Sequence, residues 1–426
     1  MLTRRQEPNE LPDLNELFAP LEAFARVGIA VSGGPDSIAL MILVARWARE
    51  QKSPPSLFVY SVDHGLRRAS QEETAFVAGE AAKLNIPARV LKWEGDKPET
   101  GLMAAARATR YRLIGSAMKK DGAEILLTAH HAHDQAETIL MRMAHGSGLG
   151  GLGGMEMFST VENIKICRPL LQIPPASLGQ IVERAGITAV ADPSNRDNNF
   201  ERVRWRKLLP ILADMELDAD RFLLFAKRIR RAERSLEEQA SKVFSNCSRI
   251  DGFGVVRIDK QEFDQQTDEL KVRLVQTALR IAGGAQKPFS LGPVEELVAQ
   301  MAGEQEIVKQ TLLGCIIEQR GTDYAFVREP SRVSRSSHLV HPGQTFEWDN
   351  RFSIRNLEKK QNIEVMSGTC LTRTHVKNLL EDSEKTPMAH IHAAPLIRDE
   401  TGKILAIGCH VLTGANKLEI SQIRGH

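Results

Sequence analysis

Between residues 27 and 171, short apolar runs alternate with stretches whose apolar positions recur every three or four residues. Short apolar runs are typical of strands covered on both faces, and the longer spacing is typical of helices that pack on a sheet. The predicted strands cover 27–31, 56–62, 88–93, 124–129 and 163–171. The predicted helices cover 36–51, 70–84, 101–120 and 134–145. This alternation predicts an α/β fold with a parallel, five-stranded, Rossmann-like sheet.

The pattern changes after residue 215. A long charged helix is predicted over 219–245, and two more over 266–302 with a Gly-Gly pair between them. From about residue 305 onward, strand-like runs are joined by turns that contain Gly, Pro, Asn and Asp. We therefore expect an α/β domain over 1–215, a mainly helical domain over 216–334 and a small β-rich domain over 335–426.

Composition and charge narrow the class of protein. The chain has 426 residues, of which 42% are hydrophobic and 26% charged, as in soluble globular proteins. A net charge of +2 is weakly basic, so a nucleic-acid site has to be a local patch. No secretory signal is evident, and no run approaches the roughly 20 apolar residues of a membrane span. The five cysteines are far apart and form no CxxC pair, which favours a reducing compartment. We expect a cytoplasmic protein that binds no membrane.

The stretch SGGPDS, residues 32–37, lies between the first predicted strand and the first predicted helix. Parallel sheets bind ligands at this edge, and glycines let backbone N–H groups point inward beside the positive end of the helix dipole. A phosphate fits such a loop, and Asp36 beside it implies a bridging Mg²⁺. No lysine and no third glycine follow, so neither of the two commonest nucleotide-binding motifs is present. A purely structural, serine-capped helix start is the alternative.

A second polar group follows the fourth predicted strand, in the stretch TAHHAHDQAET. His130 and His131 lie at the carboxyl edge of that strand, and Asp134 and Glu137 share one helix face at i, i+3. We expect these side chains to point toward the same crevice as the loop. One alternative is a zinc site made by histidines, although adjacent histidines project in different directions. Another is that the acids cap the helix and the histidines are solvated.

Glycine and arginine clusters add to the candidate chemistry. Residues 146–154 contain six glycines, too costly in entropy for a regular element, which indicates a mobile flap, with a plain linker as the alternative. Arg107 and Arg110 are about one helical turn apart. A second cluster contains Arg202, Arg204, Arg206 and Lys207. A single arginine would usually lie on a solvated face, but the two clusters together indicate clamps on ATP or an RNA backbone.

These residues establish a family resemblance. The spacing SGGxDS resembles the PP-loop of the N-type ATP pyrophosphatases, enzymes that split ATP into AMP and pyrophosphate. The chain resembles the tRNA(Ile)-lysidine synthases across about 27–210. The matching motifs, in family order, are SGGPDS, VDHGLRRAS, AARATRY, TAHHAHDQAET, HGSGLGGLGGM, RPLL and DPSNRDNNFERVR.

The resemblance implies a ligase that acts on tRNA. Residues 1–215 would bind ATP and carry out catalysis, and the two later domains would bind tRNA. The implied substrates are ATP, L-lysine and the tRNA(Ile) with a CAU anticodon. The C2 carbonyl oxygen of the wobble cytidine would attack the α-phosphate of ATP and release pyrophosphate. The lysine amine would then displace AMP, which changes codon specificity from AUG to AUA. The oligomeric state stays open, with a homodimer among the options.

The resemblance also implies roles for single residues. Those that would hold the phosphates of ATP are Ser32, Gly33, Gly34, Pro35, Asp36 and Ser37. Those that would serve the active centre are Asp36, Arg110, His130, Asp134, Glu137 and Arg202. Mg²⁺ would lie near Asp36 and Asp134. The chain departs from the family pattern at Met103, His133, His145 and Val203.

Other functions fit part of the pattern. A tRNA thiolase of the same superfamily would need cysteines near the site, where Cys167 stands alone. An enzyme that ligates an amide to a small metabolite, as GMP and argininosuccinate synthetases do, would leave the large C-terminal half unexplained. A non-catalytic RNA-binding protein with a degenerate nucleotide fold would leave the intact SGGPDS loop unexplained.

Overall fold

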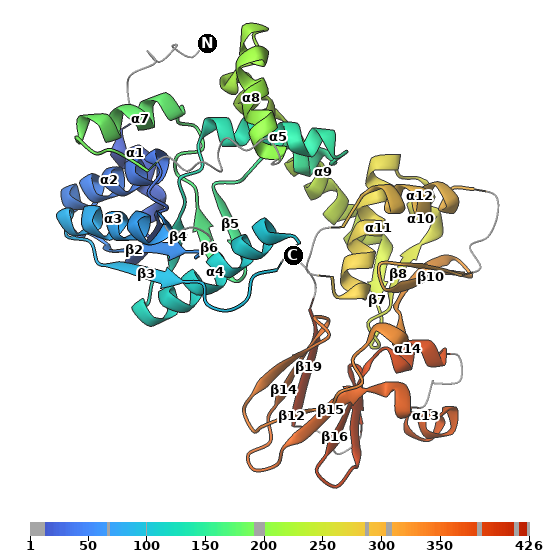
Figure 1. Cartoon of the computed structure of the whole chain (residues 1–426). Coiled ribbons are helices and arrows are strands. Elements are labelled where there is room, and N and C mark those ends of the chain that lie inside the picture. Colours follow the sequence, from blue (N-terminus) through green and yellow to red (C-terminus); the bar gives the residue numbers. More distant parts are fainter. Residues whose placement is uncertain are drawn as a thin grey trace. The chain divides into compact units, whose positions relative to one another are not determined.

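The computed structural model describes residues 13–65, 69–98, 100–190, 201–285, 289–303, 309–380, 386–412 and 417–423 (Figure 1). By their internal contacts the residues form two compact units, Met1–Arg231 and Ala232–His426. The boundary falls within the long helix α9 (Ala219–Cys247). In the described ranges, no helix is both long enough and apolar enough to cross a membrane.

A six-stranded sheet forms the centre of the first unit, in the order β3-β2-β1-β4-β6-β5. Its strands are β1 (Arg26–Ala30), β2 (Ser56–Asp63), β3 (Ala88–Lys92), β4 (Ile125–Leu127), β5 (Phe158–Val161) and β6 (Ile164–Cys167). The five strands predicted from the sequence are present and run parallel. β5 is an additional antiparallel strand at the edge, so the predicted count of five is one too low.

The unpredicted strand β5 has a physical explanation. It joins β6 through a two-residue turn at Glu162 and Asn163, which have φ values of 47° and 63°. Such turns usually contain glycine, and that signal is missing here. The residues of β5 also alternate in exposure, as expected of a strand at a sheet edge, so it lacks the apolar run that marks its neighbours.

Helices cover both faces of this sheet (Figure 1). One face carries α2 (Pro35–Glu50), α3 (Ala69–Lys83) and α7 (Pro175–Arg184), which pack around strand residues such as Val27 and Ile29. The other face carries α4 (Leu102–Asp121), which packs on residues such as Leu126 and Ile166. Because successive strand residues point to opposite faces, β1, β2, β3, β4 and β6 each supply side chains to both clusters.

The remaining helices of the first unit are α1 (Leu14–Phe18), α5 (Ala132–Ala144), α6 (Leu149–Leu152) and α8 (Glu201–Asp214). α5 begins shortly after the end of β4. It packs against α8 and the first turns of α9 through Ala136, Ile139, Leu209 and Phe222. This packing places the start of α5 at the carboxyl edge of the sheet.

The second unit contains a five-stranded antiparallel sheet in the order β7-β8-β11-β10-β9. Its strands are β7 (Ser248–Ile250), β8 (Val256–Asp259), β9 (Gln310–Leu312), β10 (Cys315–Arg320) and β11 (Asp323–Arg328). The helices beside it are α10 (Lys260–Asp264), α11 (Asp268–Gly283) and α12 (Gly292–Met301). α11 ends at the Gly-Gly pair because Gly284 takes a φ of 63° as its C-cap. This sheet lies within the stretch expected to be mainly helical.

The last part of the chain is rich in strands. They are β12 (His338–Val340), β13 (Thr345–Trp348), β14 (Phe352–Asn356), β15 (Ile363–Ser367), β16 (Pro395–Asp399), β17 (Ile404–Ile407), β18 (His410–Val411) and β19 (Leu418–Gln422). They form two sheets, β12-β15-β16-β17-β18 and β13-β14-β19, with short helices α13 (Arg373–Leu379) and α14 (Met388–His392). One hydrophobic cluster joins Phe253 and Ile316 to Leu396 and Ile407. The division into three domains at 215 and 334 stays a prediction.

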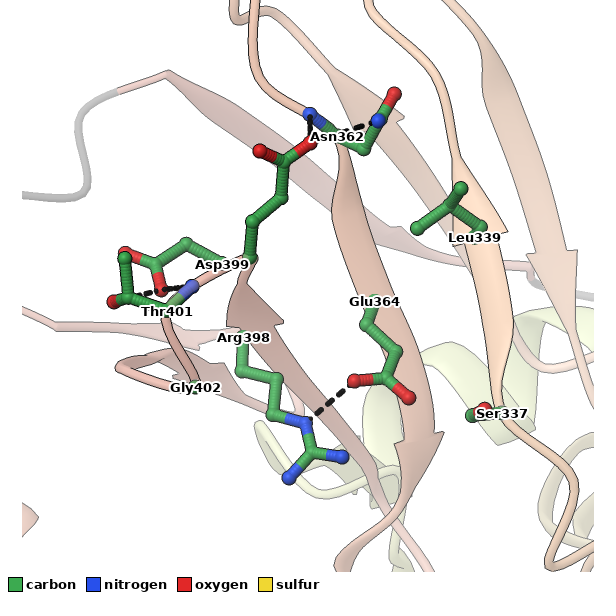
Figure 2. Close-up of a pocket in the computed structure, with 9 residues that line it drawn as sticks. Ser337, Leu339, Asn362, Glu364, Arg398, Asp399, Thr401 and Gly402 are labelled. Carbon is green, nitrogen blue, oxygen red and sulfur yellow. Dashed lines mark hydrogen bonds and ion pairs between the residues drawn. The ribbon is translucent and has the colours of Figure 1, made fainter.

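A cavity of about 610 Å³ opens on the sheet of β12, β15 and β16 (Figure 2). Arg398 in this cavity donates to Glu364 at 2.6 Å, so its charge is already paired. Asp399 and Glu400 also line the cavity. With three carboxylates and one paired arginine, the lining does not suit an RNA phosphate.

Candidate active site

Residues 32–37 form the turn between β1 and α2. Gly33 has a φ of +92°, and a Cβ there would lie 3.3 Å from a neighbouring valine side chain, so the turn requires glycine. The Ser37 hydroxyl donates to the carbonyl of Gly34 at 2.9 Å and accepts the N–H of Ser32 at 3.2 Å. Gly34 is the N-cap of α2, and no side chain caps the helix. The first N–H groups of α2 are therefore left for an anion.

His131 connects two carboxylates at this edge. Its Nε2 lies 3.6 Å from Oδ2 of Asp36 and 3.5 Å from Oδ2 of Asp134. The ring is buried, and its Nδ1 accepts the backbone N–H of Asp134 as the N-cap of α5. Burial alone lowers the pKa of His131, but the hydrogen bond to Asp36 and the charges of Asp134, Asp36 and Glu137 raise the pKa overall. The structure thus brings Asp36 and Asp134 to one place.

Two arginines of α8 hold the acids of α5. Arg202 donates from Nε to Oε2 of Glu137 at 2.7 Å and from Nη2 to Oδ1 of Asp134 at 3.0 Å. Arg206 donates from Nε and Nη2 to the two oxygens of Glu137, at 2.7 and 3.4 Å. The Glu137 side chain is 0% exposed, so both its oxygens are committed to guanidinium groups. Burial alone raises the pKa of Asp134, but the charges of His131 and Arg202 hold it below its usual value.

His130 lies on the α4 side of the sheet edge. It follows Leu126, which packs in the α4 cluster, and Thr128 at two-residue steps along the chain. Its Nδ1 is 2.9 Å from Oγ1 of Thr128. Burial, together with the charges of Arg168, Arg202 and Arg107, lowers the pKa of His130 to about 4 against the attraction of Asp134. The ring is therefore neutral at physiological pH.

Arg110 approaches the end of a different strand. It projects from α4 and donates from Nε and Nη2 to Nε2 of His64, at 3.4 and 3.2 Å. His64 directly follows β2, and burial and the charge of Arg110 lower its pKa to about 4. Because β2 neighbours β1, Arg110 lies at the same sheet edge as the loop. No hydrogen bond or ion pair within the described ranges joins it to Asp36 or Asp134.

The glycine-rich segment 146–154 is folded. Its middle forms the short helix α6, so the expectation that it cannot hold a regular element is wrong. Arg142 of α5 donates to two carbonyls of the segment at 2.7 Å each, and Arg230 of α9 donates to a third at 2.6 Å. These charge-assisted hydrogen bonds offset the entropy that the glycines lose on ordering. Its opening as a flap stays a prediction.

The positions that depart from the family pattern differ in their surroundings. His145 lies 3.1 Å from a carboxylate oxygen of Glu201. Val203 is buried, and Met103 is 55% exposed. The ring of His133 is 6.0 Å from that of His131. In the part of the chain that the structure describes, no group of three or more His, Cys, Asp or Glu is arranged to hold a metal ion.

Sequence reasoning directed His131 toward the crevice and counted Arg206 in an arginine cluster, but it gave neither an individual role, and it singled out neither His64 nor Arg168. His64 and Arg168 stand in the motifs VDHGLRRAS and RPLL, which could have pointed to both. The contacts of His131 and Arg206 depend on how α5 and α8 pack, for which the sequence carries no signal. Residues 66–68 of VDHGLRRAS and 192–200, which make up DPSNRDNNF, lie outside the described residues.

Comparison with known proteins identifies first the class and then the family. Residues 8–212 match the family model of the PP-loop domain, so the sheet and its loop define a PP-loop protein that binds ATP. A tRNA(Ile)-lysidine synthase of Rhodopseudomonas palustris is 39% identical over 333 residues, covering 76% of this chain and 96% of that one. One of Wolbachia sp. subsp. Brugia malayi is 29% identical over 400 residues, covering 92% of each chain. The chain belongs to the tRNA(Ile)-lysidine synthase family.

Among solved structures, the U34-tRNA thiolase NcsA of Methanococcus maripaludis aligns with 51% of this chain and 76% of its own, at 14% identity and a TM-score of 0.44. A likeness at this level supports no inference about activity.

Proposed function

We propose that this protein joins L-lysine to C2 of the wobble cytidine in the CAU anticodon of tRNA(Ile), using ATP and releasing AMP and pyrophosphate. Membership of the family supports the reaction. One observation connects the reaction to these residues: the ring of His131 contacts both Asp36 and Asp134. This contact links the loop that would hold ATP to the helix that would meet the second substrate. The modified tRNA would read AUA in place of AUG.

The first step places ATP on the turn between β1 and α2. The uncapped N–H groups of α2 and the hydroxyl of Ser32 suit its phosphates. Attack of the cytosine oxygen on the α-phosphate builds negative charge on the departing pyrophosphate. Arg110 at the neighbouring strand end would neutralise part of that charge. His64, neutral at physiological pH, accepts from Arg110 and orients its guanidinium.

Asp36 fits a magnesium site. Its side chain is 36% exposed and lies in the first turn of α2, beside the loop. Mg²⁺ is usually held by one or two carboxylates together with substrate phosphates. Asp134 fits less well, because its oxygens already accept from Arg202 and from the backbone N–H of His131. When bound there, Mg²⁺ would neutralise charge on the phosphates of ATP.

For the second step, Asp134 is better placed than Glu137 to receive the ammonium of lysine. The Asp134 side chain is 13% exposed, and its lowered pKa keeps it ionised at neutral pH. An ionised carboxylate orients an ammonium group for attack. Glu137 is enclosed by two guanidinium groups, so it would act by holding Arg202 and Arg206 in position.

The chain beyond the PP-loop domain would bind tRNA. Four exposed cations on α9, Lys227, Arg228, Arg231 and Arg234, form a local basic stripe of the kind that an RNA backbone requires. The acidic cavity in Figure 2 is unsuited to this role. Cytoplasmic location and oligomeric state stay predictions from the sequence.

The alternatives have less support. A thiolase would use a reactive cysteine, but Cys167 is buried, and burial raises the pKa of its thiol to about 12. That thiol stays protonated at neutral pH. A non-catalytic RNA-binding protein would not need the features found at the start of α2. This helix begins without a side-chain cap after a glycine turn, and Asp36 in its first turn lies beside the buried ring of His131.

The test incubates the protein with ATP, isotope-labelled lysine and tRNA(Ile), digests the tRNA and determines the masses of its nucleosides. One cytidine should gain the mass of labelled lysine less one water, with AMP and pyrophosphate formed in step. A tRNA(Ile) transcript with uridine at the wobble position is the matched control and should give none of these products. If the protein forms AMP and pyrophosphate from ATP with a small-molecule acceptor, at a rate that does not depend on tRNA, the proposal is refuted.

A further inference from the structure

Arg168 is a buried cation without an anionic partner. It directly follows β6 at the carboxyl edge of the sheet and is 5% exposed. Its Nη1 donates to the carbonyl of Glu156 at 3.0 Å and to the hydroxyl of Ser159 at 2.8 Å. Its Nε is buried and has no hydrogen-bond partner, and no carboxylate of the described ranges forms an ion pair with it. Buried charges in proteins are normally paired, so this one calls for an anion.

The unoccupied side of this guanidinium is the edge formed by Nε and Nη2. Other arginines of the chain present the same edge to a carboxylate, among them Arg89 to Asp121. Arg206 does so to Glu137, at 2.7 and 3.4 Å, and Arg328 does so to Asp349, at 3.0 and 3.1 Å. The edge matches the two oxygens of a carboxylate in spacing and in charge. In Arg168 it forms no ion pair with a carboxylate that the structure describes, and the charge of Glu156 acts on the guanidinium only from beyond ion-pair distance.

A second cation lies on the helix that covers this part of the sheet. Arg107 is exposed, and its Cζ lies 5.2 Å from the centroid of the Tyr111 ring. Tyr111 packs in the α4 cluster with Ile166, and Arg168 follows Ile166 by two residues, which places it on the same face. Like Arg168, Arg107 forms no ion pair with the described residues. The charges of both arginines act on His130, and the charge of Arg107 also acts on Arg168, so the three groups lie within range of one another's charge.

The site of Arg168, at the end of β6, and the loop 32–37, which follows β1, lie on opposite sides of β4. The strand order puts β4 next to β1, and β6 next to β4. Neighbouring strands are roughly 5 Å apart, which puts the end of β6 roughly 10 Å from the loop. Asp134, assigned above to the ammonium of lysine, is in the first turn of α5, the helix that follows β4, and β4 is the strand between β1 and β6. An extended lysine whose amine is at Asp134 can therefore direct its carboxylate toward Arg168, away from the phosphates of ATP.

We propose that Arg168, with the exposed Arg107 beside it, binds the α-carboxylate of the lysine substrate. The inference rests on the proposed function, since it takes lysine as the amine. The carboxylate takes no part in the new C–N bond and is free to be recognised. An amine without a carboxylate would leave Arg168 unpaired, so the contact selects for an amino acid. Nε is closed to solvent in the described conformation, so binding of a carboxylate there requires a neighbouring side chain to move aside.

The test compares L-lysine with 1,5-diaminopentane, which is lysine without its carboxylate, using the full-length protein and tRNA(Ile). For the wild type, kcat/KM for lysine should exceed that for the diamine roughly 10- to 100-fold, as expected of a charge-assisted pair. Arg168→Gln should remove this preference by lowering kcat/KM for lysine alone. Pyrophosphate release from ATP and tRNA without lysine should be unchanged. Arg112→Gln, an exposed arginine of α4 that lines a different cavity, is the matched control and should keep the preference.

If circular dichroism shows that Arg168→Gln is unfolded, Arg168→Lys and Arg107→Gln replace it, and each should weaken the preference. A preference for lysine that survives in the folded variants overturns the proposal. A fall in tRNA affinity with the preference intact does so too, and would assign the two cations to an RNA phosphate. Should the wild type join neither amine to tRNA, the proposed function fails and the carboxylate site fails with it.

Discussion

At the residue scale, neighbouring side chains of the site differ in protonation because they face different charges. His130 lies among arginines, and its pKa of about 4 keeps it neutral. His131 lies between Asp36 and Asp134, whose charges help to raise its pKa. The two rings are adjacent in the chain but serve different purposes. A neutral ring can accept a hydrogen bond, as Nδ1 of His131 does from the N–H of Asp134, and a proton on Nε2 of His131 lies toward Asp36 and Asp134 and offsets their mutual repulsion.

Asp36→Ala should abolish pyrophosphate release while leaving tRNA affinity nearly intact. The substitution removes the carboxylate beside the phosphate loop and touches no surface proposed for tRNA. Glu50→Ala, at the exposed far end of the same helix, is the matched control. A pyrophosphate assay and a filter-binding titration check the two expectations. Retained pyrophosphate release would remove Asp36 from the site.

His131→Asn tests the raised pKa of this ring. Asparagine keeps an oxygen that can cap α5 but cannot take up the proton. Folding raises the pKa of His131 above its ordinary 6.5, so the folded state binds the proton more tightly than the unfolded state. That stabilisation is complete below pH 6.5 and is lost as the pH rises through the raised pKa. In urea unfolding, the free energy of unfolding of the wild type minus that of the variant should therefore fall as the pH rises through the raised pKa of His131. If this difference in free energy of unfolding stays constant or increases over the same pH range, the pKa of His131 is not raised by folding.

At the scale of elements, α5 connects the parts of the site. Its N-cap is His131, and its first turns carry Asp134 and Glu137. Its other contacts hold the glycine-rich segment. Gln135 exchanges two hydrogen bonds with the backbone of Met155, at 2.7 and 2.6 Å. Gln135, the residue next to Asp134, thus holds the backbone at the end of the glycine-rich segment. A change in that segment should therefore shift the position of Asp134.

Gly154→Ala should disturb this connection. Gly154 has a φ of +73°, and a Cβ there would lie 2.5 Å from Oε1 of Gln135. The variant should lose roughly 1 to 3 kcal/mol of stability and join lysine more slowly. Gly179→Ala in α7 is the control, because no atom lies within 4 Å of its Cβ position. Alanine in that helix should stabilise by roughly 0.5 to 1 kcal/mol. Thermal unfolding compares them, and equal stability of the two variants would count against the role given to Gly154.

At the scale of the whole molecule, the expected boundary at residue 334 crosses a shared core. Phe253, Val255 and Ile316 pack with Leu371, Leu396 and Ile407 in one cluster. Buried apolar contacts of this kind contribute most of the stability of a domain. The two stretches expected as separate domains therefore stabilise each other within the second unit.

Removal of residues 335–426 should expose the apolar partners that remain. The truncated chain should bind a hydrophobic dye and lose affinity for tRNA, while the loop of the first unit still binds ATP. Dye fluorescence and the two binding titrations, at one fixed salt concentration, measure these effects. Unchanged tRNA affinity would refute a tRNA-binding role for residues 335–426. If the truncated chain binds no more dye than the full chain, the shared hydrophobic cluster does not stabilise the rest of the second unit.

Local patterns were sufficient for much of the fold. Apolar runs, glycine turns and helical spacing located five parallel strands and the helices between them, because each signal lies within one short stretch. The same patterns failed for β5, whose turn lacks glycine, and for α6, whose glycines are ordered by arginines elsewhere in the chain. They also gave no sign of β7 and β8, which are short and lie among strong helices.

Sequence alone was enough to identify the loop, the acids of α5 and the family, since motifs are contiguous in the chain. It could not assign the state of each group. His131 between two carboxylates, Glu137 enclosed by Arg202 and Arg206, and the empty edge of Arg168 all depend on side chains that are brought close only by packing. Electrostatic and hydrogen-bond energies fall off within a few ångströms, so the partners that set charge and reactivity are a property of distances in space.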